Sequence, residues 1–275
     1  MSEEADGEEM VEDKTLSRRK FAQLLGVGVA GVAIGASSAS VLLPEKEKEK
    51  IVEVERDVEM SEYKSYSNLD PDAVAERAYN AYYEAGCCYG AFEGIIGELR
   101  ETKGHPFDLV PSKMMVYGKG GGMGWGTLCG ALNGAGAAMC MVSDDYGDMF
   151  TELMGYYSET TLPIYEPSTP RTDMTMVSSR SDSPLCHASV SKWCVASGHG
   201  ADAPERKERC ARLTADTARK TAIMLNEAAA GTFAATYALP ADAIECLDCH
   251  GDGKAENNVH GKGICGPCHE PHEIG

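Results

Sequence analysis

Two copies of the pattern Cys-x-x-Cys-His lie within the last thirty residues of this 275-residue chain. Covalent attachment of haem needs two thiols, one for each vinyl group, and a histidine that can reach the iron. This spacing places the thiols about one helical turn apart, so the adjacent histidine falls beneath the porphyrin. The sequence therefore predicts two haem c groups, bound covalently by Cys246 and Cys249 and by Cys265 and Cys268, with His250 and His269 as proximal iron ligands.

The alternative for these four cysteines is a zinc ribbon, which needs cysteine pairs held by a small β scaffold. The connecting segment 251–264, GDGKAENNVHGKGI, has no strand pattern and few apolar side chains. A haem is large and apolar enough to act as the core of such a segment. We therefore favour haem over zinc, and we expect residues 239–275 to form a short irregular dihaem tail.

The sixth ligand decides whether each haem is a closed carrier or an open catalyst. No methionine lies beyond Met224, whereas His260 and His272 both lie in the tail, so these two histidines are the candidate distal ligands. A second histidine gives a low-potential, closed haem. Other histidines are weaker candidates: His105 and His199 lie on loops, and His187 follows Cys186 on a predicted helix, which is typical of a hydrogen-bonding or packed residue.

The first forty-three residues have the pattern of an export signal. Arg18 and Arg19 precede Phe21 and a Gly/Ala-rich apolar run that reaches Leu43. Paired arginines before a weakly apolar stretch are typical of Tat signals, read by the Tat export machinery. Small residues at 38–40 resemble a cleavage site. We expect a periplasmic or otherwise extracytoplasmic protein, anchored in the membrane only if the leader is retained.

Charge limits the choice of partners. The net charge is −18, and the first forty residues carry seven acidic and four basic side chains, which leaves the remainder near −15. No basic stripe is available for phosphates, so nucleic acid is excluded as a partner. The acidic surplus suits redox partner proteins with a positively charged docking face, although it is also ordinary for a well-dissolved protein.

Hydrophobic periodicity predicts a mainly α fold. Residues 44–67 read as a charged spacer, and 68–238 as a helical domain carrying a cysteine-ligated centre. Within it we expect a long helix from Pro71, with Asp70 as N-cap and Gly104 at its end, weakened near Gly86 and Gly90. Further helices are expected over 127–142, over 144–160, from Ser183 with Pro184 at its start to Gly198, and over 203–233.

The glycine-rich stretch GKGGGMGWG at 118–126 was compared with the patterns of nucleotide-binding loops. No register fits G-x-G-x-x-G, no strand clearly precedes it, and no Gly-Lys-Ser/Thr ends it. The glycines more plausibly let the backbone turn tightly and bring the next helix close to another helix or to a cofactor.

Seven of the eleven cysteines lie outside the haem motifs. Exported proteins use cysteines for disulfides, and small buried thiols also pack cores. Spacing alone does not choose, because this set has no Cys-x-x-Cys pair. Five could converge from different helices, namely Cys88, Cys129, Cys186, Cys194 and Cys210. Cys87 and Cys140 are assigned to packing, although a small helix rotation would exchange Cys87 for Cys88.

The stretches CCYGAF, GGGMGWGTLCGALNGA, SPLCHASVSKWC and RKERCARL resemble the successive signatures of the C_GCAxxG_C_C family of redox proteins. With two haem motifs at its end, the chain resembles the split-Soret cytochromes c from about residue 70 onward. The resemblance maps the family's cysteines onto Cys88, Cys129, Cys186 and Cys210, with Cys194 as an additional candidate. It implies a helical fold, a homodimer, two bis-histidine haems per subunit and an iron–sulfur cluster held by four of these five cysteines.

These observations predict an exported dihaem c-type cytochrome with an iron–sulfur centre, acting as a non-catalytic carrier of single electrons between redox partners. Two alternatives stay open, a haem oxidoreductase with one open axial position and a disulfide-stabilised dihaem cytochrome without a cluster. Tat export moves folded proteins, whereas haem attachment needs accessible thiols after transit. A tail beyond the folded domain meets both demands.

Overall fold

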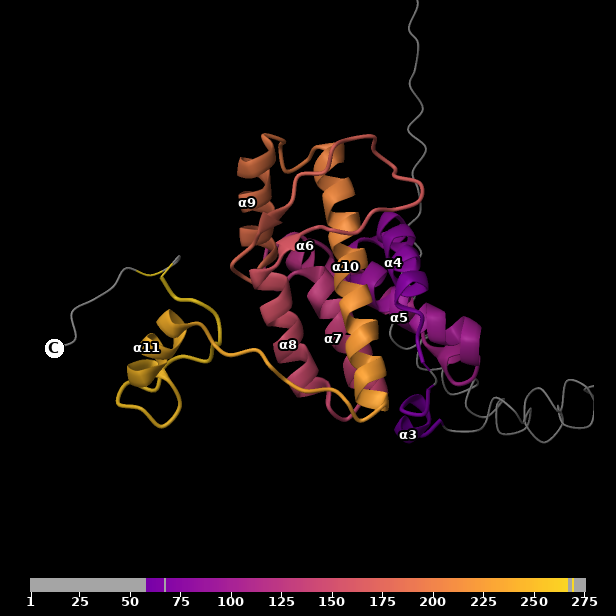
Figure 1. Ribbon diagram of the computed structural model, residues 1–275, viewed down its shortest axis with the longest axis horizontal. Coiled ribbons are helices and arrows are strands. Elements are labelled where there is room, and N and C mark those ends of the chain that lie inside the picture. Colours follow the sequence, from indigo (N-terminus) through magenta and orange to yellow (C-terminus); the bar gives the residue numbers. More distant parts are fainter. Residues whose placement is uncertain (1–57, 67, 267–268, 270–275) are drawn as a thin grey trace, which may run out of the picture. The chain divides into compact units, whose positions relative to one another are not determined.

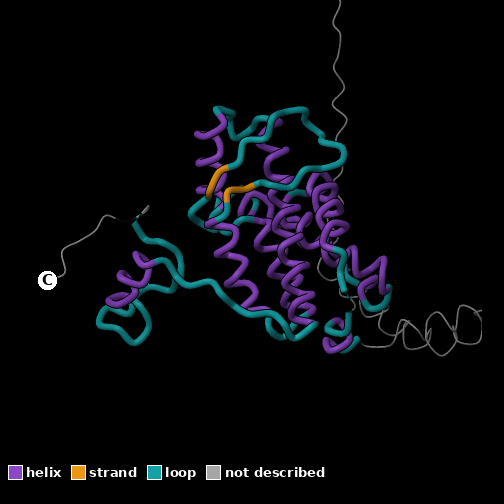
Figure 2. Tube along the Cα trace, viewed as in Figure 1, coloured by secondary structure: helices purple, strands orange, loops and turns teal. Residues whose placement is uncertain are grey.

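The computed structural model describes residues 58–66, 68–266 and 269, and these are mainly helical, as predicted (Figure 1, Figure 2). The predicted export signal and most of the charged spacer lie outside the described residues. In chain order, the elements are α3 (Met60–Tyr63), α4 (Pro71–Ala85), α5 (Cys87–Lys103), η1 (Phe107–Leu109), η2 (Ser112–Gly118), α6 (Lys119–Gly122), α7 (Gly130–Val142), α8 (Tyr146–Glu159), β1 (Thr161–Leu162), β2 (Ser179–Arg180), α9 (Cys186–Ser197), α10 (Pro204–Ala229) and α11 (Ala241–His250).

A bundle of five helices forms the core. α4 packs against α5, α5 against α7 and α7 against α8, while the long α10 packs against α4, α5, α7 and α8 (Figure 1). The buried face of α5 includes Phe92, Ile95, Ile96 and Leu99, all fully buried. Burying one such side chain contributes about 1.5–3 kcal/mol, so this packing holds the helix ends in fixed positions. The only sheet within the described ranges is the two-stranded antiparallel pair β1–β2.

The predicted single helix from Pro71 to residue 103 is two helices. Asp70 caps its start as expected, accepting hydrogen bonds from the backbone N–H groups of Asp72 and Ala73, and Gly104 ends it. Gly86 breaks it, with φ +94°, and a side chain there would place Cβ 2.8 Å from Lys119 Cβ. A positive φ is easily adopted only by glycine, so the chain turns at Gly86 and packs α5 back on α4. Gly90, the other predicted weak point, lies inside α5.

Two other predicted helix starts are displaced towards the C-terminus. α7 begins at Gly130 rather than at Thr127, because Thr127 donates its backbone N–H and its hydroxyl to the carbonyl of Gly121 in the preceding glycine-rich turn. α9 begins at Cys186, with Leu185 at the N-cap, rather than after a Ser183 cap. Ser183 Oγ instead accepts from the backbone N–H of Leu185 in a local turn.

The tail is more regular than the sequence suggests. An extended segment leads from α10 to α11, which contains the first haem motif. The connecting segment folds back on the end of this helix, since Glu256 N–H donates to the carbonyl of Cys249 and the N–H groups of Asn258 and Val259 donate to that of His250. The irregular tail predicted from composition therefore holds for residues 251–266 but not for α11. No helix in 58–66 or 68–266 is long and apolar enough to cross a membrane.

Candidate metal centre and haem tail

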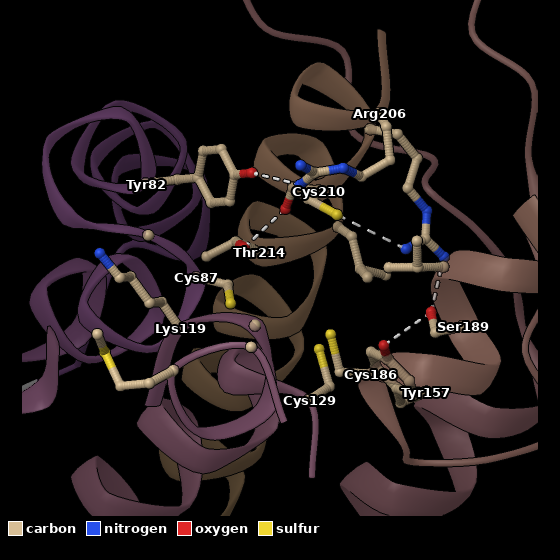
Figure 3. A pocket seen from close by; sticks show the side chains of 17 residues that line it. Tyr82, Cys87, Lys119, Cys129, Tyr157, Cys186, Ser189, Arg206, Cys210 and Thr214 are labelled. Atoms are coloured by element: carbon tan, nitrogen blue, oxygen red, sulfur yellow. Dashed lines mark hydrogen bonds between the residues drawn. The ribbon is translucent and has the colours of Figure 1, made fainter. Parts of the chain in front are cut away.

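Four thiols from four helices line one cavity of about 360 Å³. They belong to Cys87 on α5, Cys129 at the start of α7, Cys186 on α9 and Cys210 on α10, and Figure 3 shows them directed into the same space. Because these cysteines are up to 123 positions apart in the chain, only the packing of the helices brings them together. We refer to this space as the four-cysteine cavity.

A short backbone pairing sets two of the four sulfur positions. Leu128 and Leu185 form an isolated antiparallel bridge. The N–H of Cys129 donates to the carbonyl of Pro184 at 2.9 Å, and the N–H of Cys186 donates to the carbonyl of Thr127 at 2.7 Å. The starts of α7 and α9 are therefore joined side by side by hydrogen bonds.

Three of the four thiols lie at helix N-termini. Cys87 and Cys186 are the first residues of α5 and α9, and Cys129 is the N-cap of α7. The helix dipole and its unpaired N–H groups favour negative charge at this end. Cys210 lies inside α10, where no helix terminus is available. Its sulfur is instead near two cations, Arg206 and Arg209, and Arg209 Nη1 lies 3.9 Å from Cys210 Sγ.

Burial favours the protonated form of three of the four thiols, those of Cys87, Cys129 and Cys186. Burial raises the pKa of Cys87 and of Cys129, and burial with the neighbouring Cys129 raises the pKa of Cys186 to about 12. Hydrogen bonds from backbone N–H groups lower these pKa values instead. Gly120 N–H acts on Cys87, and Ala131 N–H acts on Cys129. A bound cation is the remaining group that can displace these protons, so metal binding here would release protons.

The four thiols are the donor set that binds iron–sulfur clusters. Within the described part of the chain, no three His, Cys, Asp or Glu side chains are gathered closely enough to hold one metal ion. In a [4Fe–4S] cluster each thiolate binds a different iron atom, so the four sulfurs lie further apart than they would around a single ion. All ten described cysteines are unpaired thiols, so no disulfide forms among them. The residues present therefore fit an iron–sulfur cluster.

Cys87 lines the four-cysteine cavity, whereas Cys88, the predicted candidate, does not. Cys88 is fully buried in the core, and its Sγ would lie 2.4 Å from a Cβ at Gly118. Successive helical residues point about 100° apart, so only one of the two cysteines can face the cavity. Gly86 starts α5 in a new orientation that turns Cys87 inward. The sequence shows the adjacent pair Cys87 and Cys88, but which of the two faces the cavity depends on the helix break at Gly86.

The additional candidate Cys194 does not line the cavity. Cys140 was assigned to packing, but it is exposed near the end of α7. Cys129, Cys186 and Cys210 do line the cavity. Among the histidines, His187 is exposed rather than packed in the core. His199 Nδ1 is 3.6 Å from a carboxylate oxygen of Glu205, and the imidazole is stacked on Trp193.

In the tail, the first haem motif is preorganised around its histidine. His250 Nδ1 donates to Asn258 Oδ1 at 2.9 Å. A neutral imidazole protonated at Nδ1 carries its lone pair on Nε2, the atom that binds iron, and such partners commonly fix the orientation of ligating histidines. The thiols of Cys246 and Cys265, one from each motif, interact with each other. Cys268 and His272 lie outside the described residues, and His260 and His269 are exposed.

Comparisons with known proteins show the family of this chain. The family model described as redox-active protein (C_GCAxxG_C_C) matches residues 89–224. Split-Soret cytochrome c of Desulfovibrio desulfuricans is 39% identical over 212 residues, which cover 73% of this chain and 75% of that protein. A solved structure, described as a novel iron centre in the split-Soret cytochrome c from D. desulfuricans ATCC 27774, matches with a TM-score of 0.71 and 38% identity, over 76% of this chain and 90% of the other. The chain belongs to the split-Soret cytochrome c family.

Proposed function

We propose that this protein is an exported dihaem cytochrome that carries single electrons, with an iron–sulfur centre in the four-cysteine cavity. Membership of the family supports a redox electron carrier with haem and iron. The finer proposal rests on one observation, the convergence of Cys87, Cys129, Cys186 and Cys210 on one cavity beside two cations. Haem iron and cluster iron each change oxidation state by one electron, which is the chemistry these groups supply.

The residues of the chain hold these groups in different ways. Cys246 and Cys249, and Cys265 and Cys268, bind the haems covalently, with His250 and His269 beneath them. The tail histidines His260 and His272 complete the coordination, so that no iron position stays open for substrate. Helix N-termini and the cations of α10 face the cluster thiolates and offset their charge. The tail accepts haem after export, because its thiols do not belong to the buried core.

Location and partners complete the proposal. Arg18 and Arg19 direct the chain to the Tat machinery, which places it outside the cytoplasm. The acidic balance of the chain favours redox partners with a positive docking face. Two copies assemble as a homodimer, as the resemblance to the family implies.

Metal and sulfide analysis of the purified protein tests the cluster. We expect two covalent haems per chain by pyridine haemochrome, with additional iron and acid-labile sulfide beyond the haem iron. A Cys129→Ser variant should lose the additional iron and sulfide and keep both haems. Total iron equal to haem iron, with no sulfide, in anaerobically purified wild-type protein would overturn the cluster.

Ligand binding to the reduced haems tests the closed carrier. Carbon monoxide should leave the Soret band of the wild-type protein unchanged, because both axial positions are filled by histidine. A His260→Ala variant should open one haem and give a carbon monoxide spectrum. A full carbon monoxide response in the wild-type protein would favour the haem oxidoreductase with an open axial position.

A further inference from the structure

Arg209 is a buried cation without a carboxylate. Its side chain is 1% exposed, and none of the ion pairs among the described residues includes it. Nη2 donates to Ser189 Oγ at 2.8 Å and Nη1 points to Cys210 Sγ at 3.9 Å, while Nε has no hydrogen-bond partner. A buried charge with only neutral partners costs several kcal/mol.

Arg212, one turn further along α10, shows what a compensated buried arginine looks like in the same helix. It is 3% exposed, and its guanidinium pairs with the buried Glu208 at 2.9 Å and with Glu166 at 2.7 Å. Glu208 also accepts from Tyr79 and Tyr83, so the charge of Arg212 is compensated by hydrogen-bonded carboxylates. The two arginines have similar burial and opposite surroundings.

A hydrogen-bonded relay holds Arg209 against the cavity. Tyr157 on α8 is fully buried and donates to Ser189 Oγ on α9, the same oxygen that accepts from Arg209 on α10. Three helices therefore fix the guanidinium of Arg209 at the wall of the four-cysteine cavity, which Arg209, Ser189 and Tyr157 all line. Asp216, the carboxylate that also senses this charge, accepts instead from the backbone N–H of Ile164.

We propose that Arg209 is the built-in counter-cation of the metal centre, so that an anionic, thiolate-ligated centre compensates its charge and stabilises this part of the fold when bound. The inference rests on the proposed centre and extends it to a residue that ligates nothing. Loading and stability are then coupled: the protein stripped of the centre keeps an uncompensated guanidinium, and the loaded protein does not. Arg209 acts as a positioning and charge-balancing residue.

The substitution Arg209→Met tests this coupling, because its effect on stability changes sign with loading. In protein stripped of non-haem iron by a chelator, we expect the variant to melt about 3 °C or more above the wild-type protein, since replacing an uncompensated buried charge by an apolar chain is stabilising. In anaerobically loaded protein, we expect the variant to lose about 10- to 100-fold in affinity for the centre and to melt below the wild-type protein. Melting is followed by helical circular dichroism, and affinity by competition with the chelator.

Arg212→Met is the matched control. It leaves Glu208 buried and unpaired whether or not the centre is bound, so it should destabilise the stripped and loaded forms equally. Arg209→Lys should keep most of the affinity for the centre, because the charge is retained. Equal destabilisation of both forms by Arg209→Met would overturn the inference, and so would unchanged affinity. Absence of non-haem iron from the wild-type protein would overturn the proposed centre itself and is recognised independently.

The reduction potential gives a second, non-structural readout. A cation beside the centre stabilises its reduced, more negative state, so Arg209→Met should move the potential of the centre to more negative values. Arg212→Met should leave it unchanged. Potentiometric titration followed by electron paramagnetic resonance measures both, and an unshifted potential in a loaded Arg209→Met protein would contradict the charge-balancing role.

Discussion

The four-cysteine cavity and the haem tail use sulfur in opposite ways. In the cavity, each thiol comes from a different helix, and backbone pairing and helix starts hold the sulfurs in place. In the tail, both thiols of a motif lie within four residues, and exposed segments surround them. The cavity depends on a folded bundle and offers its ligands together, whereas the tail carries its chemistry in local spacing.

This difference predicts which substitutions should affect the centre in the cavity and which should affect the haems. Changes in helix packing should alter the cavity and leave haem attachment intact, because a haem motif needs only its own thiols and histidine. Changes in the tail should remove haem and leave the cavity centre intact. Substitutions in each region therefore test whether the two regions are independent.

The largest expected effect is the loss of one haem. Cys249→Ser removes a thioether from the first motif, so covalent haem should fall from two per chain to one, while acid-labile sulfide stays unchanged. Mass spectrometry of the intact chain measures the haem, and sulfide analysis measures the centre. Loss of the sulfide together with the haem would show that the two regions are not independent.

A neighbouring pair of substitutions sharpens the description of the cavity. Cys87→Ser should cost about 100-fold or more in affinity for the centre, because a thiolate ligand is lost, whereas Cys88→Ser should keep the centre and lose only core packing. Chelator competition separates the two variants. The reverse result would assign the ligand to Cys88, as the sequence suggested.

The stability of the helix bundle should depend on pH through Asp216. Burial raises its pKa to about 7, against backbone hydrogen bonds from Ile164 and Tyr165 that lower it. The pKa of Asp216 in the folded protein exceeds the ordinary value of 3.8, so the protonated carboxyl group stabilises the fold relative to the ionised one. This contribution is complete below about pH 4 and is lost as pH rises through about 7. The wild-type protein should therefore lose roughly 2–3 kcal/mol more than Asp216→Asn between pH 5 and 8.

Urea unfolding at both pH values measures this difference. Covalent haem content should be equal in the two proteins at every pH, since thioether bonds do not depend on the stability of the bundle. Parallel pH profiles for the wild-type protein and Asp216→Asn would contradict the raised pKa.

The smallest expected effect concerns Gly130, which allows Cys87 its place. A Cβ at this position would lie 2.4 Å from Cys87 Sγ and 2.7 Å from the carbonyl oxygen of Gly118. Gly130→Ala should destabilise the bundle by about 1–3 kcal/mol and weaken the centre, while both haems remain. Gly147→Ala in α8 is the control. A Cβ at this position meets nothing within 4 Å, so this substitution should leave the stability unchanged or raise it. Equal effects of the two substitutions would exclude the contact with Cys87 as the cause.

The amino-acid sequence was sufficient for features that depend on neighbouring residues. The Asp70 cap, the glycine ends at Gly104 and Gly198, and the helices over α8 and α10 follow from local hydrogen bonding and periodicity. The haem motifs were equally readable, because two thiols and a histidine act within five residues. Three of the four cavity cysteines were also among the predicted candidates.

Tertiary structure decided the rest, because the deciding contacts join residues far apart in the chain. Gly86 turns Cys87 rather than Cys88 into the cavity, since α5 must pack back on α4. The pairing of Leu128 with Leu185 joins the starts of α7 and α9 and so sets where two of the sulfurs lie. Arg209 looks in sequence like one more charge of a solvated helix, and only the tertiary structure shows that it is buried beside Cys210 in the lining of the four-cysteine cavity.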